Sequence, residues 1–356
     1  MTADPKSFQP RPFRPAWWLP GAHAQTVMGR FVRPPHGVKY HRERVETPDG
    51  DFLDLDFASI QGAPPLAENA PLCLIIHGLE GSAHSAYVLE LSRALREYGI
   101  RAVAMNFRGC SGEPNRALRF YHAGETGDLE FVLELLASRF PDAPLLAAGF
   151  SLGANVLLKH LGERGDGTRI RAAVAVSVPF DLGRGSDKLD RSFMGRVYVR
   201  HFVRRLRAKF NAKAERIGDR LDAERIRSAR TFREFDDAAT ARLHGFDGAE
   251  DYYSRSSSGP YLRHIRVPVL LVQAADDPFV DETAIPYGDI AASPWLATAF
   301  TERGGHVGFI SGSPRRPWFW AEREAARFLG AQAGTEPALN VRQEAGQHGH
   351  KTKRRI

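Results

Sequence analysis

Cysteine is almost absent from this chain, which has 356 residues and only two cysteines, Cys73 and Cys110. Two cysteines provide neither a disulfide framework nor the ligand spacing of a zinc site. Long apolar runs are also missing, since no stretch reaches the roughly 18 residues of a membrane-spanning helix. The N-terminal stretch lacks the apolar core of a signal peptide and is interrupted by prolines. These absences predict a cytoplasmic protein.

Acidic residues are scarce in two segments of the chain. Residues 191–233 hold 14 Lys and Arg against 4 Asp and Glu, and residues 331–356 hold 5 against 2. The formal net charge is only +7, so the rest of the chain is acidic. No DNA- or RNA-binding motif accompanies the basic segments, and the sequence therefore predicts no nucleic-acid partner.

Short apolar runs alternate with helical patterns along most of the chain. Runs such as residues 72–78, 145–150 and 268–277 are typical of strands buried on both faces. Helical segments between them indicate βαβ units, and hence an α/β fold with a mostly parallel sheet flanked by helices. We expect four parts: an extended arm over 1–35, an α/β core over 36–180 and 262–330, a helical cap insertion over 181–261, and a disordered basic tail over 331–356.

The stretch GFSLG at residues 149–153 places a serine between two glycines, after a buried strand and at the start of a helix. In that context G-x-S-x-G is typical of a sharp turn that holds an exposed serine at its apex. Ser151 is therefore the candidate nucleophile. The backbone N–H of Leu152, at the helix N-terminus, is a candidate oxyanion donor. The loop HGLEGS after the strand at 72–78 supplies a second candidate donor, the N–H of Leu79.

A nucleophilic serine needs a base, and the base needs a group that orients it. His306 lies beyond the last expected strand, in the loop RGGHVGF. Asp276 and Asp277 follow an earlier buried strand, which gives the order Ser, Asp, His of α/β-hydrolases. We favour Asp277 because similar hydrolases commonly have their acid directly before a Pro-x-Val-like turn. Asp276 is the alternative.

The chain resembles the YheT-like branch of the α/β-hydrolases, bacterial esterases related to eukaryotic ABHD proteins. The resemblance lies in HGLEGS, NFRGCSGEPN, YHAGETGDL, GFSLGANVLLKHLGE, the DDPF turn and GGHVGF, and extends over about residues 13–330. It implies the α/β-hydrolase fold and hydrolysis of carboxylic esters. It also implies that Ser151, Asp277 and His306 are the charge-relay residues.

These features together predict a serine hydrolase that cleaves small-molecule or lipid esters through an acyl-enzyme and needs no cofactor. No ligand spacing such as HExxH indicates a metal site. Acyl transfer to an alcohol and phospholipase-type lipid hydrolysis are alternatives within the same chemistry. A non-catalytic binding protein is a further alternative, because a fold alone does not fix function. We interpret His77, Arg108 and Asp128 as structural supports.

The expected cap carries one apolar stripe beside basic residues. On a helix, residues four apart share a face, and such a row is formed by Met194, Tyr198, Phe202, Leu206 and Phe210. Four arginines of the same segment lie mostly off this stripe, namely Arg196, Arg200, Arg204 and Arg207. One interpretation is a structural cap helix with a solvated basic face. The other makes the stripe an acyl-chain wall and the arginines a contact for an anionic membrane surface.

Overall fold

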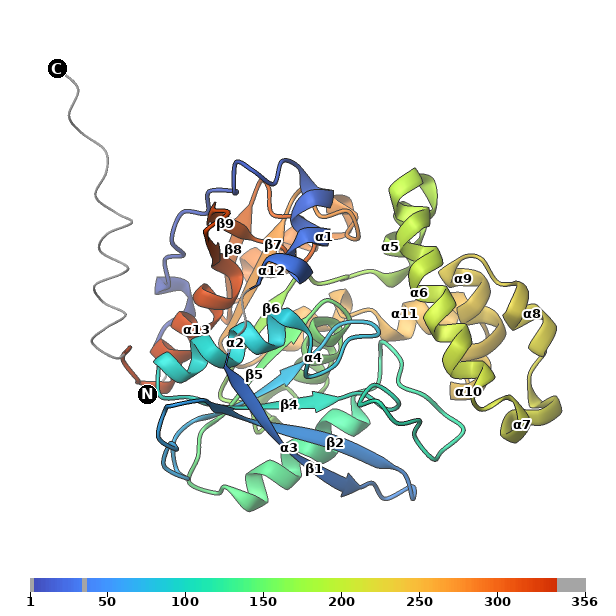
Figure 1. The fold of residues 1–356 in the computed structure, drawn as a ribbon, viewed down its shortest axis with the longest axis horizontal. Helices are drawn as coiled ribbons and strands as arrows, with labels where there is room; N and C mark the ends of the chain where they lie inside the picture. The colour runs from blue at the N-terminus through green and yellow to red at the C-terminus, as the bar shows by residue number, and fades with distance from the viewer. Residues whose placement is uncertain (1–2, 34–36, 338–356) are drawn as a thin grey trace.

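The computed structural model describes residues 3–33 and 37–337, and an eight-stranded sheet forms its centre (Figure 1). The strand order is β1-β2-β4-β3-β5-β6-β7-β8. β2 pairs antiparallel with β1 and β4, and all other neighbouring strands are parallel. The strands are β1 (Val38–Glu46), β2 (Phe52–Ile60), β3 (Leu72–Ile76), β4 (Arg101–Asn106), β5 (Leu145–Phe150), β6 (Ala172–Val176), β7 (Val269–Ala274) and β8 (Leu296–Thr301). The predicted mostly parallel sheet is confirmed.

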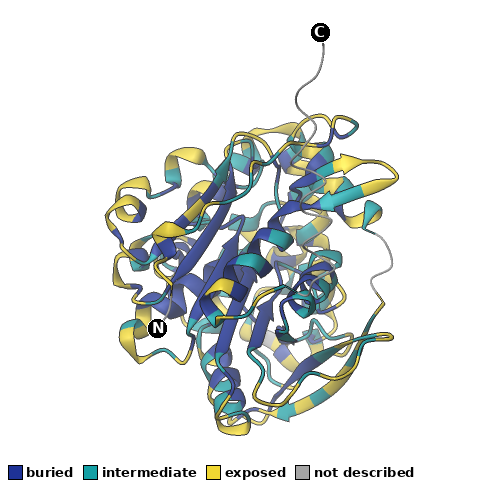
Figure 2. Cartoon of the chain, turned by 90° about the vertical axis from the view of Figure 1, so that its left-hand side faces the viewer, coloured by how far each residue is buried: buried dark blue, intermediate teal, exposed yellow. Residues whose placement is uncertain are grey.

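Helices cover both faces of the sheet, and the buried strands divide the core into two apolar clusters. Along β3, Leu72, Leu74 and Ile76 point into one cluster, whereas Cys73 and Ile75 point into the other. This alternation explains why the strand is a continuous apolar run in the sequence. Figure 2 shows these central strands as buried and the surrounding helices as partly exposed. The flanking helices are α2 (Ala86–Glu97), α3 (Gly127–Arg139), α4 (Leu152–Arg164) and α13 (Trp320–Ala333).

The segment that we expected to form the cap leaves the sheet after β6 and returns before β7, and a series of helices lies between these two strands. Its α-helices have an apolar cluster of their own that includes Val199, Val203 and Phe210, so the segment has an independent packing centre. The helices are α5 (Leu182–Arg191), α6 (Phe193–Asn211), α7 (Ala214–Ile217), α8 (Ala223–Ser228), α9 (Phe232–Phe235), α10 (Ala241–His244) and α11 (Ala249–Ser256). None of the helices in the described part of the chain is long and apolar enough to span a membrane.

The N-terminal arm differs from the expected extended conformation, because it contains α1 (Ala22–Val32). The prolines of the arm surround this segment but do not enter it. The buried side chain of Gln25 donates a hydrogen bond to the carbonyl oxygen of Ile310 (3.0 Å) and accepts one from its N–H (2.7 Å). This long-range contact, together with apolar packing, fixes α1 on the body of the protein.

The C-terminal part also differs from expectation in two places. A hairpin formed by β9 (Ile310–Ser313) and β10 (Arg316–Phe319) precedes the last helix, and the sequence pattern had not indicated it. Helix α13 then extends to Ala333, so residue 331 was too early a start for the expected tail over 331–356. The remainder of that expected tail, 338–356, lies outside the described residues.

Candidate active site

Ser151 lies in a tight turn between β5 and α4. Its φ is 52°, a left-handed conformation that residues with a Cβ seldom adopt. A Cβ at Gly149 would lie 2.6 Å from the Cα of Ala154. A Cβ at Gly153 would lie 2.4 Å from the carbonyl oxygen of Ile76. The two glycines are therefore required because β3, β5 and α4 pack too closely for side chains at these positions.

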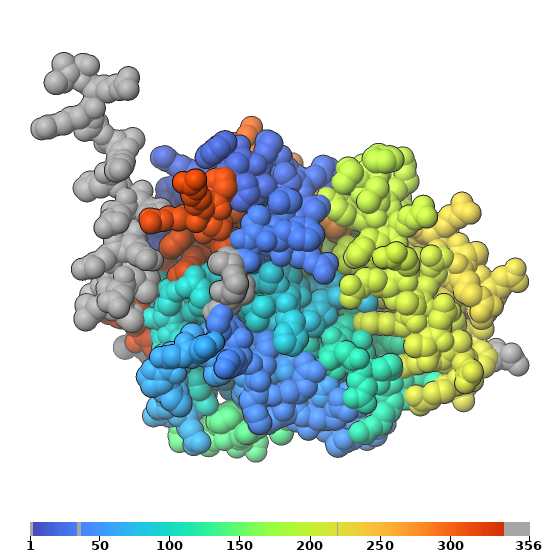
Figure 3. Space-filling model, in the orientation of Figure 1, coloured from blue at the N-terminus to red at the C-terminus, as the bar shows by residue number. Residues whose placement is uncertain are grey.

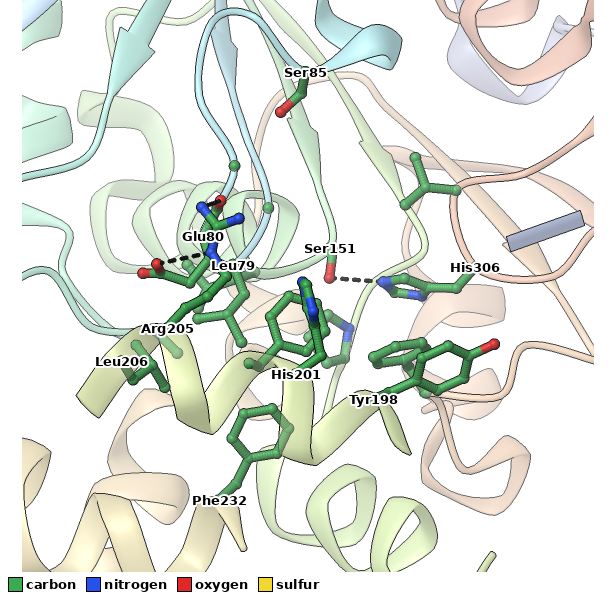
Figure 4. A pocket seen from close by; sticks show the side chains of 18 of the residues that line it. Leu79, Glu80, Ser85, Ser151, Tyr198, His201, Arg205, Leu206, Phe232 and His306 are labelled. Atoms are coloured by element: carbon green, nitrogen blue, oxygen red, sulfur yellow. Dashed lines mark hydrogen bonds and ion pairs between the residues drawn. The ribbon is translucent and has the colours of Figure 1, made fainter. Parts of the chain in front are cut away.

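Ser151, His306 and Asp277 form one hydrogen-bonded chain. His306 Nε2 lies 2.8 Å from Ser151 Oγ (Figure 4), and His306 Nδ1 lies 2.8 Å from Asp277 Oδ2. The Asp277 side chain is fully buried and also accepts a hydrogen bond from the N–H of Phe279 (2.8 Å). The structure thus brings together the three residues that the sequence singled out. A buried carboxylate in this position holds the imidazole in one orientation and stabilises its protonated form.

Asp276, the alternative acid, contacts the backbone of the loop that carries His306. Among the interactions of the described residues, none joins Asp276 to the imidazole. Its Oδ1 accepts a hydrogen bond from the N–H of Gly305 (2.8 Å). The N–H of His306 donates to Thr26 Oγ1 of α1 (2.9 Å), and the ring of Phe279 stacks on the imidazole with centroids 4.3 Å apart. The loop is therefore held from the sheet and from the N-terminal arm. No local pattern in the sequence indicated the contribution of Thr26.

Leu79 and Leu152, the two expected oxyanion donors, line the same cavity as Ser151. Leu152 is the first residue of α4, and N–H groups in a first helical turn have no partner inside the helix. Leu79 follows Gly78, where a Cβ would lie 3.2 Å from the Cβ of Ser151. The loop after β3 therefore lies against the serine. Two backbone N–H groups beside a nucleophile are the arrangement that stabilises a tetrahedral oxyanion.

Two tyrosines hold the backbone on either side of Leu79. The N–H of Gly78 donates to Tyr87 Oη, and the N–H of Glu80 donates to Tyr121 Oη, each over 2.9 Å. Glu80 has a φ of 55°, which turns the chain sharply at this point. Among the described residues, no acceptor pairs with the Leu79 N–H between them. The loop is thus positioned by its neighbours while this one N–H stays available.

Glu80 also joins the loop to the cap helix α6. Its side chain is buried, and its Oε1 accepts a hydrogen bond from Lys209 Nζ (2.7 Å). The guanidinium of Arg205 donates to the Glu80 carbonyl oxygen over 3.1 Å (Figure 4). Burial acts to lower the pKa of Lys209, but the neighbouring Cys110 and Glu80 outweigh it and raise that pKa. Lys209 is therefore a charged partner of Glu80, a contact between residues 129 positions apart that the sequence analysis missed.

Ser151 opens into a cavity of about 930 Å³, a size that accommodates a small-molecule or lipid substrate. The cap and the N-terminal arm supply much of its apolar wall. Three residues of the apolar stripe line it, whereas Phe210 is buried in the cap's own cluster. The apolar wall residues from α1, α6 and α9 are Val27, Phe31, Val197, Tyr198, Phe202, Leu206 and Phe232.

His77 has a structural position beside this site. Burial lowers the pKa of His77 to about 4, so its ring is neutral at physiological pH. Its Nε2 accepts a hydrogen bond from the N–H of Phe107 (3.1 Å), and its Nδ1 lies 2.7 Å from the carbonyl oxygen of Gly78. Arg108 is likewise buried and forms a two-bond ion pair with Asp128 (2.7 and 2.6 Å). These contacts agree with the interpretation of His77, Arg108 and Asp128 as supports.

One group of metal-type side chains lies at the edge of the cavity, although the sequence spacing had not indicated it. The ligand atoms of His122, Glu125 and His244 lie within 4.8 Å of one another. Burial lowers the pKa of His122 to about 2 and that of His244 to about 4. The N–H of Gly124 donates to His122 Nδ1 (3.1 Å), which places the ring proton on Nε2. Arg119 also pairs with Glu125 (3.3 Å), so the local charges disfavour a bound cation.

Comparisons with known proteins identify the fold and the family of the chain. The sequence profile of the alpha/beta hydrolase fold matches residues 71–313. YheT of Escherichia coli strain K12, an esterase by its name, is 40% identical over 319 residues, which are 89% of this chain and 92% of that protein. Human Phospholipase ABHD3 is 30% identical over 321 residues, 90% of this chain and 78% of its own. A solved esterase of Pyrococcus furiosus, 18% identical, shares the fold with a TM-score of 0.54 over 84% of this chain and 93% of its own.

Proposed function

The chain belongs to the YheT-like branch of the α/β-hydrolase family and is an ester hydrolase, and we propose that it cleaves carboxylic esters with Ser151 as nucleophile. In this proposal His306 is the general base and Asp277 orients it. The observation that carries the proposal is the hydrogen-bonded chain Ser151–His306–Asp277, of which Ser151 and His306 line a substrate-sized cavity.

The reaction proceeds in two acyl-transfer steps. His306 Nε2 accepts the Ser151 hydroxyl proton while Oγ attacks the ester carbonyl carbon. The N–H groups of Leu79 and Leu152 donate hydrogen bonds to the resulting oxyanion. The C–O bond to the alcohol then breaks, and the imidazolium protonates the departing alkoxide. Water, deprotonated by the same imidazole, attacks the acyl-enzyme, and the carboxylic acid leaves as Ser151 regains its proton.

The apolar walls favour an ester with an extended acyl chain. Tyr198, Phe202 and Leu206 present one continuous apolar side of α6 to the cavity. Burial of apolar surface contributes about 0.8 kcal/mol for each methylene removed from water, so each added methylene should improve binding until the wall ends. Phospholipid ester hydrolysis is a second candidate, because Arg30 and Arg205 line the same cavity and one relative is named a phospholipase.

A chain-length series tests this proposal. We expect kcat/KM for p-nitrophenyl esters to rise from acetate to medium-chain esters in the wild-type protein, and Ser151→Ala to lose turnover of all of them. Lysophospholipids and acylglycerols extend the series to natural lipid esters. A flat profile would contradict the acyl-chain wall. Undiminished turnover by Ser151→Ala would contradict the nucleophile.

A further inference from the structure

Exposed apolar side chains gather around the entrance of the Ser151 cavity. Of the six large hydrophobic side chains that are exposed in the described part of the chain, four lie on α1 and α6: Val27, Phe31, Phe193 and Val197. Phe31 is 69% exposed and Phe193 is 72% exposed. Val27, Phe31 and Val197 also line the cavity. Apolar groups that are both exposed and cavity-lining mark the rim of its opening, and such clustering indicates an interaction surface.

The helices α1 and α6 lie side by side at this opening. His23 Nδ1 on α1 lies 3.0 Å from the Tyr198 hydroxyl on α6. Figure 3 shows the atoms of the N-terminal segment (blue) next to those of α5 and α6 (yellow-green) on one face of the molecule. We call this surface the entrance face. On each helix its residues recur at spacings of three and four, as one helical face requires; they are Val27, Arg30 and Phe31 on α1, and Phe193, Val197, Arg200 and Arg204 on α6.

The entrance face carries charge of one sign. Helix α1 contains 1 basic residue and α6 contains 6, and neither contains Asp or Glu. Among the described residues, the exposed side chains of Arg30, Arg200 and Arg204 have no hydrogen bond or ion pair. The pKa of His201 on α6 is lowered, first by burial and then by the charges of Arg205, Arg204 and Arg30. Positive charges from both helices therefore act on this one side chain. These arginines are exposed cations without a protein partner, and they lie beside exposed aromatic side chains. Such a surface is complementary to a partner that is both anionic and apolar.

We propose that the entrance face docks on an anionic lipid surface, from which an ester passes into the cavity. Phe31, Phe193 and the valines enter the acyl boundary, and the arginines contact lipid phosphates. Val27, Phe31 and Val197 line the entrance, so a docked ester meets apolar walls without crossing water. A second copy of this chain would bring like charges together, which disfavours it as the occupant. Docking does not require turnover and therefore goes beyond the proposed function.

Vesicle co-sedimentation with the full chain tests the docking surface. We expect the wild-type protein to bind vesicles of phosphatidylcholine mixed with phosphatidylglycerol more tightly than vesicles of phosphatidylcholine alone. Each basic residue at such a surface contributes about 1 kcal/mol, so Arg200→Glu combined with Arg204→Glu should weaken binding by about 30-fold or more. Phe193→Ser should also weaken it. Ser151→Ala should bind as the wild type does, which separates docking from catalysis.

A matched charge reversal controls for non-specific attraction. Arg227→Glu on α8 combined with Arg242→Glu on α10 changes the net charge by the same amount as the Arg200→Glu/Arg204→Glu variant. On these two helices, the described residues include no exposed large hydrophobic side chain. This control should keep wild-type vesicle binding. Turnover of a short soluble ester by the Arg200→Glu/Arg204→Glu variant should stay at the wild-type level, because neither side chain lines the cavity.

Several results would overturn the proposal. One is equal binding of the wild type to both kinds of vesicle. A second is equal loss in the control and in the Arg200→Glu/Arg204→Glu variant, which would mean attraction by net charge alone. A third is wild-type vesicle binding by the Arg200→Glu/Arg204→Glu variant or by Phe193→Ser, which would assign membrane contact to another part of the chain. A fourth is a wild-type dimer that Phe193→Ser dissociates, which would make this face a self-interface.

Discussion

The two sides of the candidate site are built differently. Ser151, Asp277 and His306 follow strands β5, β7 and β8, so the sheet fixes their separation. The apolar walls come instead from α1 and α6, which lie outside the sheet and meet through contacts such as His23–Tyr198. Strand ends in a paired sheet cannot shift independently, whereas packed helices can. Changes on the sheet side should therefore alter the rate for every ester, and changes in the walls should alter which ester is preferred.

The sharpest test of the sheet side compares two adjacent carboxylates. Asp277→Asn should lower kcat by about 10⁴-fold, because the amide stabilises the wrong imidazole tautomer. Asp276→Asn should have a far smaller effect, since an amide oxygen can still accept the hydrogen bond from Gly305. Steady-state kinetics on a short soluble ester would measure both, with circular dichroism to verify folding. The opposite ranking in folded variants would reassign the acid.

A second test concerns the contact that crosses between the two sides. Lys209 on α6 holds Glu80, next to the proposed oxyanion donor Leu79. Losing a hydrogen bond to a charged group costs about 1.5–3 kcal/mol, and we expect Lys209→Met to lower kcat by about tenfold while KM changes little. Lys209→Arg should recover much of the rate. A change in KM alone, or no recovery in Lys209→Arg, would show that this cap residue does not position the loop.

The sequence predicted the sheet side well because its signals are local. The buried runs, the glycines around Ser151 and the loop of His306 are each readable within a few residues. Two adjacent aspartates are harder to separate in this way, since their spacings from every other motif differ by one residue and only the likeness of the following turn to other hydrolases favoured Asp277. Their hydrogen bonds distinguish them in the structure, where Asp277 contacts the imidazole and Asp276 contacts Gly305.

The wall side was predicted less completely because its contacts join distant residues. Helix α1 was expected to be extended, since prolines surround it, and its position depends on Gln25 and Ile310, 285 residues apart. The apolar stripe of α6 was identified, but periodicity alone could not say which residues face the cavity. Phe202 lines it and Phe210 does not. The difference depends on how the cap packs against the body.

A third prediction tests the walls directly. Phe202→Ala should lower kcat/KM for medium- and long-chain esters by about tenfold and leave acetate esters nearly unchanged, because an acetyl group buries far less apolar surface against this wall than a longer acyl chain does. Phe193→Ala removes the same atoms from an exposed position on the same helix and should leave both classes unchanged in solution. Kinetics across a p-nitrophenyl ester series would measure the selectivity. Equal losses for short and long esters would leave Phe202 as a structural residue of the cap.

The smallest expected effect concerns a carboxyl group in the cap wall. Burial raises the pKa of Asp236 to about 6, from 3.8. The folded state therefore binds this proton more tightly than the unfolded state, and the resulting stabilisation is lost as the pH rises through 6. Asp236→Asn should remove this part of the pH dependence, which amounts to about 2 kcal/mol of unfolding free energy between about pH 4.5 and about pH 7.5. Urea denaturation at about pH 4.5 and about pH 7.5 would measure it; parallel pH profiles for variant and wild type would contradict the assignment.

The identity of the nucleophile is the central claim, and a covalent probe tests it most directly. A fluorophosphonate reacts with an activated serine and leaves a phosphonyl group that mass spectrometry can locate on a peptide. We predict a single adduct on the peptide containing Ser151 in the wild-type protein and no labelling of folded Ser151→Ala. Labelling of another serine in the wild type, or undiminished labelling of Ser151→Ala, would contradict the account.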